Sequence, residues 1–168
     1  DALKILGERQ DQPQAVLIKG RQNYLCLRRL IQTAQEPDLF TQEAEELAAI
    51  QQWAKTTEEG ARSALPFMPS AGLWSKICSE SDNCLGQRCP FFTSCFVMKL
   101  RKKAEKAAIL IVNHHLLFAD LASRKDGAGY ASTAVLPPFN AVIFDEAHTI
   151  EESASGFFSR TFSRYELN

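Results

Sequence analysis

Four consecutive residues, Asp145-Glu146-Ala147-His148, have the types and the position to carry out phosphate chemistry. They follow directly on the apolar run Ala141-Val142-Ile143-Phe144. A buried parallel strand delivers its last residues to the carboxyl edge of the sheet, where α/β proteins bind their ligands. There one carboxylate can hold Mg²⁺ through water, and its neighbour can deprotonate a water that attacks a phosphate. A strand ending in an acidic turn is the simpler interpretation, but the apolar run in front favours a nucleotide site.

Only half of an ATPase site is present in this sequence. It contains no Gly-x-x-x-x-Gly-Lys-Ser/Thr loop (Walker A), the element that cradles the β- and γ-phosphates of a nucleotide. We therefore expect that the chain does not hydrolyse ATP on its own.

The cysteines form a second group that could do chemistry. Four of the five crowd into residues 78–95: Cys78, Cys84, Cys89 and Cys95. The fifth, Cys26, lies far upstream. In a reducing compartment such a cluster more often binds metal than forms disulfides, and four thiolates suit either a zinc ion or a cubane iron–sulfur cluster.

Two details of the spacing favour iron–sulfur over zinc. Structural zinc sites usually contain close C-x2-C pairs, and this sequence has none. Pro90 directly after Cys89 is typical of ferredoxin ligation. Spacing alone makes the nearby Cys78 the fourth ligand, and zinc remains the alternative metal.

A basic stripe follows the cysteines at helical spacing. It consists of Lys99, Lys102, Lys103 and Lys106, with Arg88 nearby. These side chains could bind DNA phosphates with an affinity that depends on salt and not on sequence. A solvated helix face is the alternative, and for a charge run alone it is the commoner case.

The elements that must position these residues are predicted from hydrophobic periodicity. Short apolar runs predict strands at Gln14–Ile18, Ile109–Val112 and Ala141–Phe144. Such runs, separated by helices or long connections, predict a parallel sheet and an α/β fold. Because adjacent residues of an extended chain point to opposite faces, we expect hydrogen-bonding roles for His114 and His115 and no shared metal.

Two helices are predicted between the first and second strands. One runs over Thr41–Glu59, where Gly60 can end it, and the other over about Thr93–Ala108. Residues 60–95 between them are rich in proline, glycine and cysteine. A loop-rich segment of this kind has little core of its own and usually needs a staple.

Composition restricts the class of protein. The chain has 168 residues, 45% of them apolar, which suits one domain or one domain with an insert. A formal net charge of −1 excludes a global attraction to nucleic acid, so any DNA-binding surface must be local. The sequence shows neither a signal peptide nor a bilayer-spanning apolar run, so we expect a soluble, cytoplasmic protein without a membrane partner.

Four separated elements occur in the order of a known family. They are the string Lys19–Cys26, the three cysteines at 84, 89 and 95, the stretch Ile111–Leu116 and the acidic box. On these elements the chain resembles the DinG/XPD group of iron–sulfur superfamily-two helicases, most closely the bacterial YoaA/DinG-like branch. The resemblance implies a monomeric 5′-to-3′ DNA helicase of DNA repair that uses ATP and Mg²⁺.

The resemblance also implies roles for individual residues. Asp145 would hold Mg²⁺, Glu146 would activate water, and His148 would couple hydrolysis to DNA movement. The first cluster ligand of the family follows a Gly-Arg-x-x-Tyr string, which here is Gly20–Tyr24. The implied ligands of a [4Fe–4S] cluster are therefore Cys26, Cys84, Cys89 and Cys95, which leaves Cys78 as the spare.

The implied fold is a partial RecA-like motor domain with a mainly helical iron–sulfur insert. Residues 1–20 and 109–152 would belong to the motor domain, residues 21–108 to the cluster domain, and residues 153–168 to the start of an arch insertion. We expect the phosphate loop before residue 1 and a second motor domain after residue 168, in a longer protein.

Two rival functions follow from the same residues. The chain could be a non-enzymatic zinc module that binds nucleic acid, in which case the acidic box is only a strand end. It could also be a scaffold whose helix at 41–59 docks a replication or repair protein. Metal analysis separates the first rival from the helicase, and a pulldown with that helix mutated tests the second.

Overall fold

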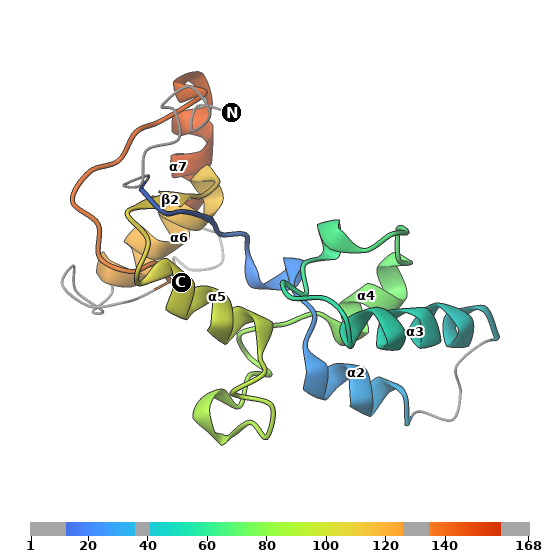
Figure 1. The fold of residues 1–168 in the computed structure, drawn as a ribbon. Helices are drawn as coiled ribbons and strands as arrows, with labels where there is room; N and C mark the ends of the chain where they lie inside the picture. The colour runs from blue at the N-terminus through green and yellow to red at the C-terminus, as the bar shows by residue number, and fades with distance from the viewer. Residues whose placement is uncertain (1–12, 36–40, 126–134, 159–168) are drawn as a thin grey trace, which may run out of the picture. The chain divides into compact units, whose positions relative to one another are not determined.

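The computed structural model describes residues 13–35, 41–125 and 135–158 (Figure 1). The chain divides into two compact units. The central unit is Ile18–Lys106, and the split unit consists of the described residues before and after it. The central unit contains η1 (Arg21–Asn23), α2 (Leu27–Thr33), α3 (Thr41–Ala54), η2 (Arg62–Ala64), α4 (Ala71–Ile77), η3 (Gly86–Arg88) and α5 (Phe96–Ala104). The split unit contains β1 (Ala15–Leu17), β2 (Ile109–Ile111), α6 (His114–Ser123), η5 (Ala147–Thr149) and α7 (Ile150–Phe158).

The sheet of the split unit is a parallel pair. β1 lies beside β2 with Ala15 opposite Ile109 and Leu17 opposite Ile111. Both strands are short apolar runs, as predicted, and the connection between them contains the whole central unit. The mixed α/β class and the parallel pairing are therefore confirmed.

The third predicted strand is wrong. Residues 141–144 have no regular secondary structure, and the side chains of Val142, Ile143 and Phe144 are all exposed, Ile143 by 97%. A buried parallel strand is defined by neighbouring strands and by helices on its faces. Among the described residues only β1 and β2 pair as strands, so the apolar run lacks the partners that would make it a strand.

A helix begins where an extended chain is predicted after β2. Asn113 is the N-cap of α6, and its side-chain oxygen accepts from the backbone N–H of Leu116 at 2.9 Å. His114 and His115 therefore lie on the first helical turn and not on opposite faces of a strand. His114 contacts Phe144 and His115 contacts Phe157, so the two rings do serve different neighbours.

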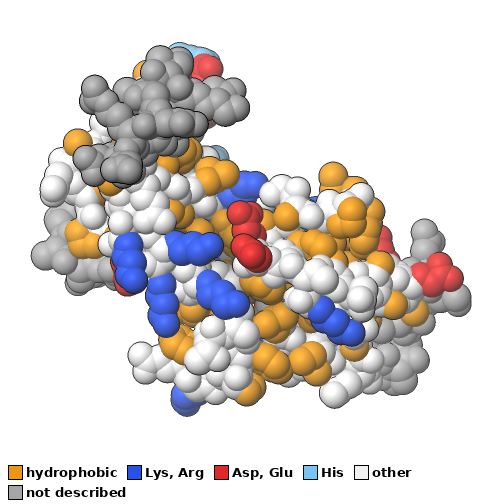
Figure 2. Space-filling model, in the orientation of Figure 1, with side chains coloured by type: hydrophobic (Ala, Val, Ile, Leu, Met, Phe, Trp, Pro, Cys, Tyr) orange, Lys and Arg blue, Asp and Glu red, His pale blue; other side chains and the backbone are white. Residues whose placement is uncertain are grey.

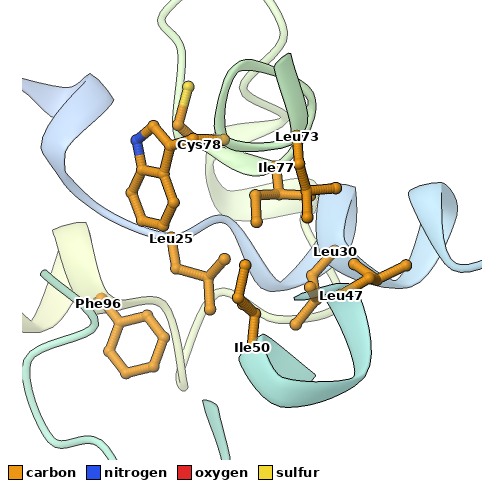
Figure 3. Close-up of a cluster of buried hydrophobic side chains, with 9 residues drawn as sticks. Leu25, Leu30, Leu47, Ile50, Leu73, Ile77, Cys78 and Phe96 are labelled. Atoms are coloured by element: carbon orange, nitrogen blue, oxygen red, sulfur yellow. The ribbon is translucent and has the colours of Figure 1, made fainter. Parts of the chain in front are cut away.

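The core of the central unit forms where α2, α3 and α4 pack together around Leu25 (Figure 3). Its fully buried members include Ile50, Leu73 and Ile77. The predicted helix at 41–59 is present as α3 but ends at Ala54. Gly60 has a left-handed backbone (φ 60°), and a Cβ there would collide with the Phe96 ring, so this close approach requires glycine.

Helix α4 lies in the segment predicted to be loop-rich. Ser70 caps it and accepts from the backbone N–H of Leu73. The Glu46 carboxylate accepts from the backbone N–H and the hydroxyl of Ser70 at 2.9 and 2.7 Å, and Glu43 pairs with Lys76 at 3.2 Å. The acidic face of α3 therefore binds α4 and is not only solvated.

The second predicted helix is present as α5 but is shorter than expected at both ends, running from Phe96 to Ala104 with Cys95 as its N-cap. No helix in the described part of the chain has both the length and the apolar character needed to cross a membrane.

Candidate nucleotide and metal sites

The acidic box forms an exposed turn in the split unit. Asp145 accepts a hydrogen bond from the backbone N–H of Glu146 through Oδ1 at 2.9 Å. The Glu146 carboxylate lies 3.3 Å from Nδ1 of His148, and both side chains are more than two-thirds exposed. Both acidic residues are exposed, so carboxylate oxygens are accessible from solvent, which suits water-mediated binding of Mg²⁺.

The backbone at Glu146 is left-handed, with φ 49° and ψ 46°. Glycine aside, it is the one residue with positive φ in the part of the chain that the structure describes. Such a conformation costs of order 1–3 kcal/mol in a non-glycine residue, and it persists where surrounding contacts determine it. The left-handed backbone therefore sets the direction of the Glu146 side chain, and holding that conformation costs free energy.

The five cysteines are all free thiols, and they differ in exposure. Cys78 is 3% exposed and belongs to the core cluster of the central unit (Figure 3). Burial raises the pKa of its thiol, which disfavours the thiolate that a metal requires. The other four, which are Cys26, Cys84, Cys89 and Cys95, are exposed or half-buried.

Three of these four thiols have distinct local positions. Cys26 and Cys95 are the N-caps of α2 and α5. The backbone N–H of Gly86 lowers the pKa of the Cys84 thiol, and Arg21 contributes further. At Cys84 the thiolate, which is the form that binds metal, is therefore favoured.

Arg101 connects two of these thiols electrostatically. Burial lowers the pKa of its guanidinium, as does Arg21, whereas the charges of Cys84 and Cys95 oppose that shift. By its chemistry, a set of four thiols with neighbouring guanidinium groups suits either a zinc ion or an iron–sulfur cluster. Among the described residues no three His, Cys, Asp or Glu side chains gather closely enough to hold a metal ion, so the ligands would have to converge on binding.

The predicted basic stripe lies on one helix. Lys99, Lys102 and Lys103 are exposed on α5, and Lys106 follows the helix, also exposed. Figure 2 shows Lys and Arg side chains gathered over α5. Arg88 lies exposed at the end of η3, so it is in the same unit as the stripe. The chain therefore presents a local basic surface despite its net charge of −1.

Comparison with known proteins finds relatives that match most of the chain. The chain is 39% identical over 168 residues to the ATP-dependent DNA helicase YoaA of Escherichia coli, covering 99% of this chain and 25% of the relative. It is 35% identical over 153 residues to YoaA of Haemophilus influenzae, covering 90% of this chain and 23% of the relative. It is 31% identical over 155 residues to the ATP-dependent helicase DinG of Mycobacterium tuberculosis, covering 83% of this chain and 22% of the relative.

The chain is homologous to the YoaA and DinG helicases. The resemblance inferred from the sequence is thus confirmed at 31–39% identity. The chain spans about a quarter of the length of these relatives. No protein-family model matches it.

The sequence analysis did not predict one buried ion pair of this chain. Asp120 of α6 and Arg124, the C-cap residue of that helix, form a fully buried ion pair, with 2.6 Å between Arg124 Nε and Asp120 Oδ2. Asp120 Oδ1 accepts from the backbone N–H groups of Val135 and Leu136, and Arg124 donates to the carbonyl of Leu136 at 2.8 Å. The spacing of four residues was the available signal, but it usually indicates a surface pair.

Proposed function

We propose that the chain is a segment of an ATP-dependent 5′-to-3′ DNA helicase of DNA repair. The observation that carries this proposal is its homology to proteins named as ATP-dependent DNA helicases, which covers 99% of the chain in one relative. The segment would contribute the acidic box of the motor domain and the iron–sulfur domain. The phosphate loop would come from elsewhere in the protein, because this sequence has none.

In this proposal the acidic box performs its half of ATP hydrolysis. Asp145 binds Mg²⁺ through water, and Glu146 orients and deprotonates the attacking water. The 3.3 Å approach of His148 to the Glu146 carboxylate supports a role for the histidine in sensing the state of that carboxylate. The exposure of both acidic side chains leaves them accessible to a nucleotide held by other parts of the protein.

The central unit would hold a [4Fe–4S] cluster through Cys26, Cys84, Cys89 and Cys95. When bound, the cluster supplies four iron–thiolate bonds that tie together distant segments of the chain. Three observations support this ligand set: the four thiols are exposed or half-buried, Cys78 is buried, and the positive charges of Arg21 and Arg101 lie near two of the four. In this role the cluster staples η3 and the loops around it, which contribute no residue to the core cluster.

The basic stripe on α5 would bind the phosphates of single-stranded DNA. Lys99→Glu, Lys102→Glu, Lys103→Glu and Lys106→Glu combined should lower single-strand affinity by 10-fold or more and flatten its salt dependence, because about four phosphate contacts are lost. Fluorescence anisotropy over a salt series in the full-length protein measures both quantities. The matched control compares two single reversals, Lys102→Glu in the stripe and Lys55→Glu at the exposed position that follows α3, and only the first should weaken binding. Unchanged affinity in the quadruple stripe variant would contradict the proposed role of the stripe.

Unwinding by the full-length protein tests the proposed function. ATP-dependent separation of a duplex with a 5′ single-stranded tail, and not of one with a 3′ tail, is the expected result. Glu146→Gln keeps the shape of the side chain and removes its charge, so it should reduce both ATP hydrolysis and unwinding to background. A wild-type protein that hydrolyses no ATP in the presence of DNA would contradict the proposal.

A further inference from the structure

The left-handed turn at Glu146 is held by hydrogen bonds from a single residue, Thr149. Thr149 donates two hydrogen bonds to the Glu146 carbonyl oxygen, from its backbone N–H and from its hydroxyl, each at 3.0 Å. The backbone bond closes the turn, and the hydroxyl bond reinforces it. Thr149 is half-buried, whereas the Glu146 side chain extends into solvent.

The Thr149 hydroxyl has a second partner, Nδ1 of His114, at 3.1 Å. A hydroxyl carries one proton, so it can donate to only one of these two acceptors at a time. When the imidazole proton is on Nδ1, the ring donates to the Thr149 hydroxyl, which in turn donates to the Glu146 carbonyl. That tautomer makes His114, Thr149 and the Glu146 backbone a directed chain of hydrogen bonds.

His114 also contacts the residue that precedes the acidic box. Its ring packs against Phe144, the residue before Asp145, with 5.9 Å between ring centroids and a tilt of 44°. The position of His114 is itself determined by β2 and by the Asn113 cap at the start of α6. A half-buried histidine on a capped helix thus touches the chain before and after the box.

We propose that His114, acting through Thr149, is a positioning residue that holds the left-handed turn and so directs the Glu146 carboxylate toward the attacking water. This inference rests on the proposed role of Glu146 in hydrolysis. In this role His114 acts on the backbone of the turn and not on the nucleotide, so its loss should remove orientation and leave nucleotide binding in place. A misplaced general base lowers kcat and has little effect on KM.

DNA-stimulated ATP hydrolysis by the full-length protein tests the proposal. His114→Ala and Thr149→Val should each lower kcat by about 10- to 100-fold with KM for ATP changed less than about 2-fold, because part of the general-base contribution is lost. Thr149→Ser and His114→Asn, which keep the hydroxyl and a donor near Nδ1, should restore most of kcat. The double variant His114→Ala with Thr149→Val should be no slower than either single variant.

His115→Ala is the matched control, because this exposed neighbour contacts Phe157 and not the box. Equal kcat in His114→Ala and His115→Ala would overturn the proposal. Failure of both His114→Asn and Thr149→Ser to restore kcat, with melting temperatures near wild type, would also overturn it, because packing alone would then explain the loss.

A second measurement keeps this inference separate from the proposed function. Proton–nitrogen NMR of the His114 ring in the wild-type protein should detect the proton on Nδ1, with a chemical shift that changes in Thr149→Val. A neutral ring protonated on Nε2 would contradict the hydrogen-bond chain even if the protein is an active helicase. If the wild type hydrolyses no ATP, the role in catalysis falls with the proposed function, while the NMR result still decides the contact.

Discussion

Cys84→Ala, purified without oxygen, should contain no iron, whereas Cys78→Ala should keep the full iron content of the wild type. The Cys84 thiol is exposed, and the Gly86 N–H lowers its pKa, so the thiolate that iron needs forms readily. Cys78 lies in the core with a raised pKa, where it behaves as a small apolar side chain. Its truncation should cost about 1–2 kcal/mol of stability and no metal.

The decisive variant is Cys26→Ala, because Cys26 and Cys78 compete for the place of the fourth ligand. Iron, sulfide and zinc are counted per chain, together with the broad absorption near 400 nm of an iron–sulfur cluster. Loss of iron in Cys78→Ala and retention in Cys26→Ala would reverse the ligand set. One zinc and no iron in the wild type would instead favour the zinc module.

Asp120→Ala should lower the free energy of unfolding of the split unit by about 3–5 kcal/mol, the usual cost of removing one member of a buried ion pair. Asp120 and Arg124 are 0% and 1% exposed in their side chains. The variant would also remove the acceptor for the backbone N–H groups of Val135 and Leu136. Urea unfolding, followed by amide NMR signals of α6, measures the loss.

Two further variants test whether the lost ion pair causes the expected drop in stability. Asp120→Leu combined with Arg124→Leu should destabilise less than Asp120→Ala, because both buried charges are then removed together. Lys125→Ala, at the exposed next position, should change stability by less than about 0.5 kcal/mol. An Asp120→Ala variant as stable as Lys125→Ala would show that the ion pair contributes little.

The two strands of the sheet could be predicted because each is a short apolar run, and such a run can be recognised from local sequence alone. β1 and β2 are short apolar stretches, and their parallel pairing follows from the long connection between them. The same reasoning failed at Ala141–Phe144, because a run of apolar residues becomes a strand only when other strands pair with it. Helix α4 was missed because seven residues are too few for a clear helical period, and the Ser70 cap was the signal available.

For the candidate sites, too, local features could be predicted from the sequence and tertiary contacts could not. The box and the cysteines were identified from residue type and spacing, but their surroundings were not. The burial of Cys78 depends on where α4 ends, and the partner of His114 lies 35 residues away. Contacts between segments distant in sequence arise from tertiary packing, which no local pattern encodes.

The insertion of the central unit between two neighbouring strands has a consequence for the order of folding. Pairing β1 with β2 must close a loop that contains all of residues 18–108. Closing an unstructured loop costs entropy that grows with its length, about 0.6 kcal/mol for each doubling. Once the central unit is compact, its two ends are already near each other and most of that cost disappears. A destabilising substitution in the core around Ile50 and Leu73 would therefore slow the formation of the sheet, although neither residue contacts a strand.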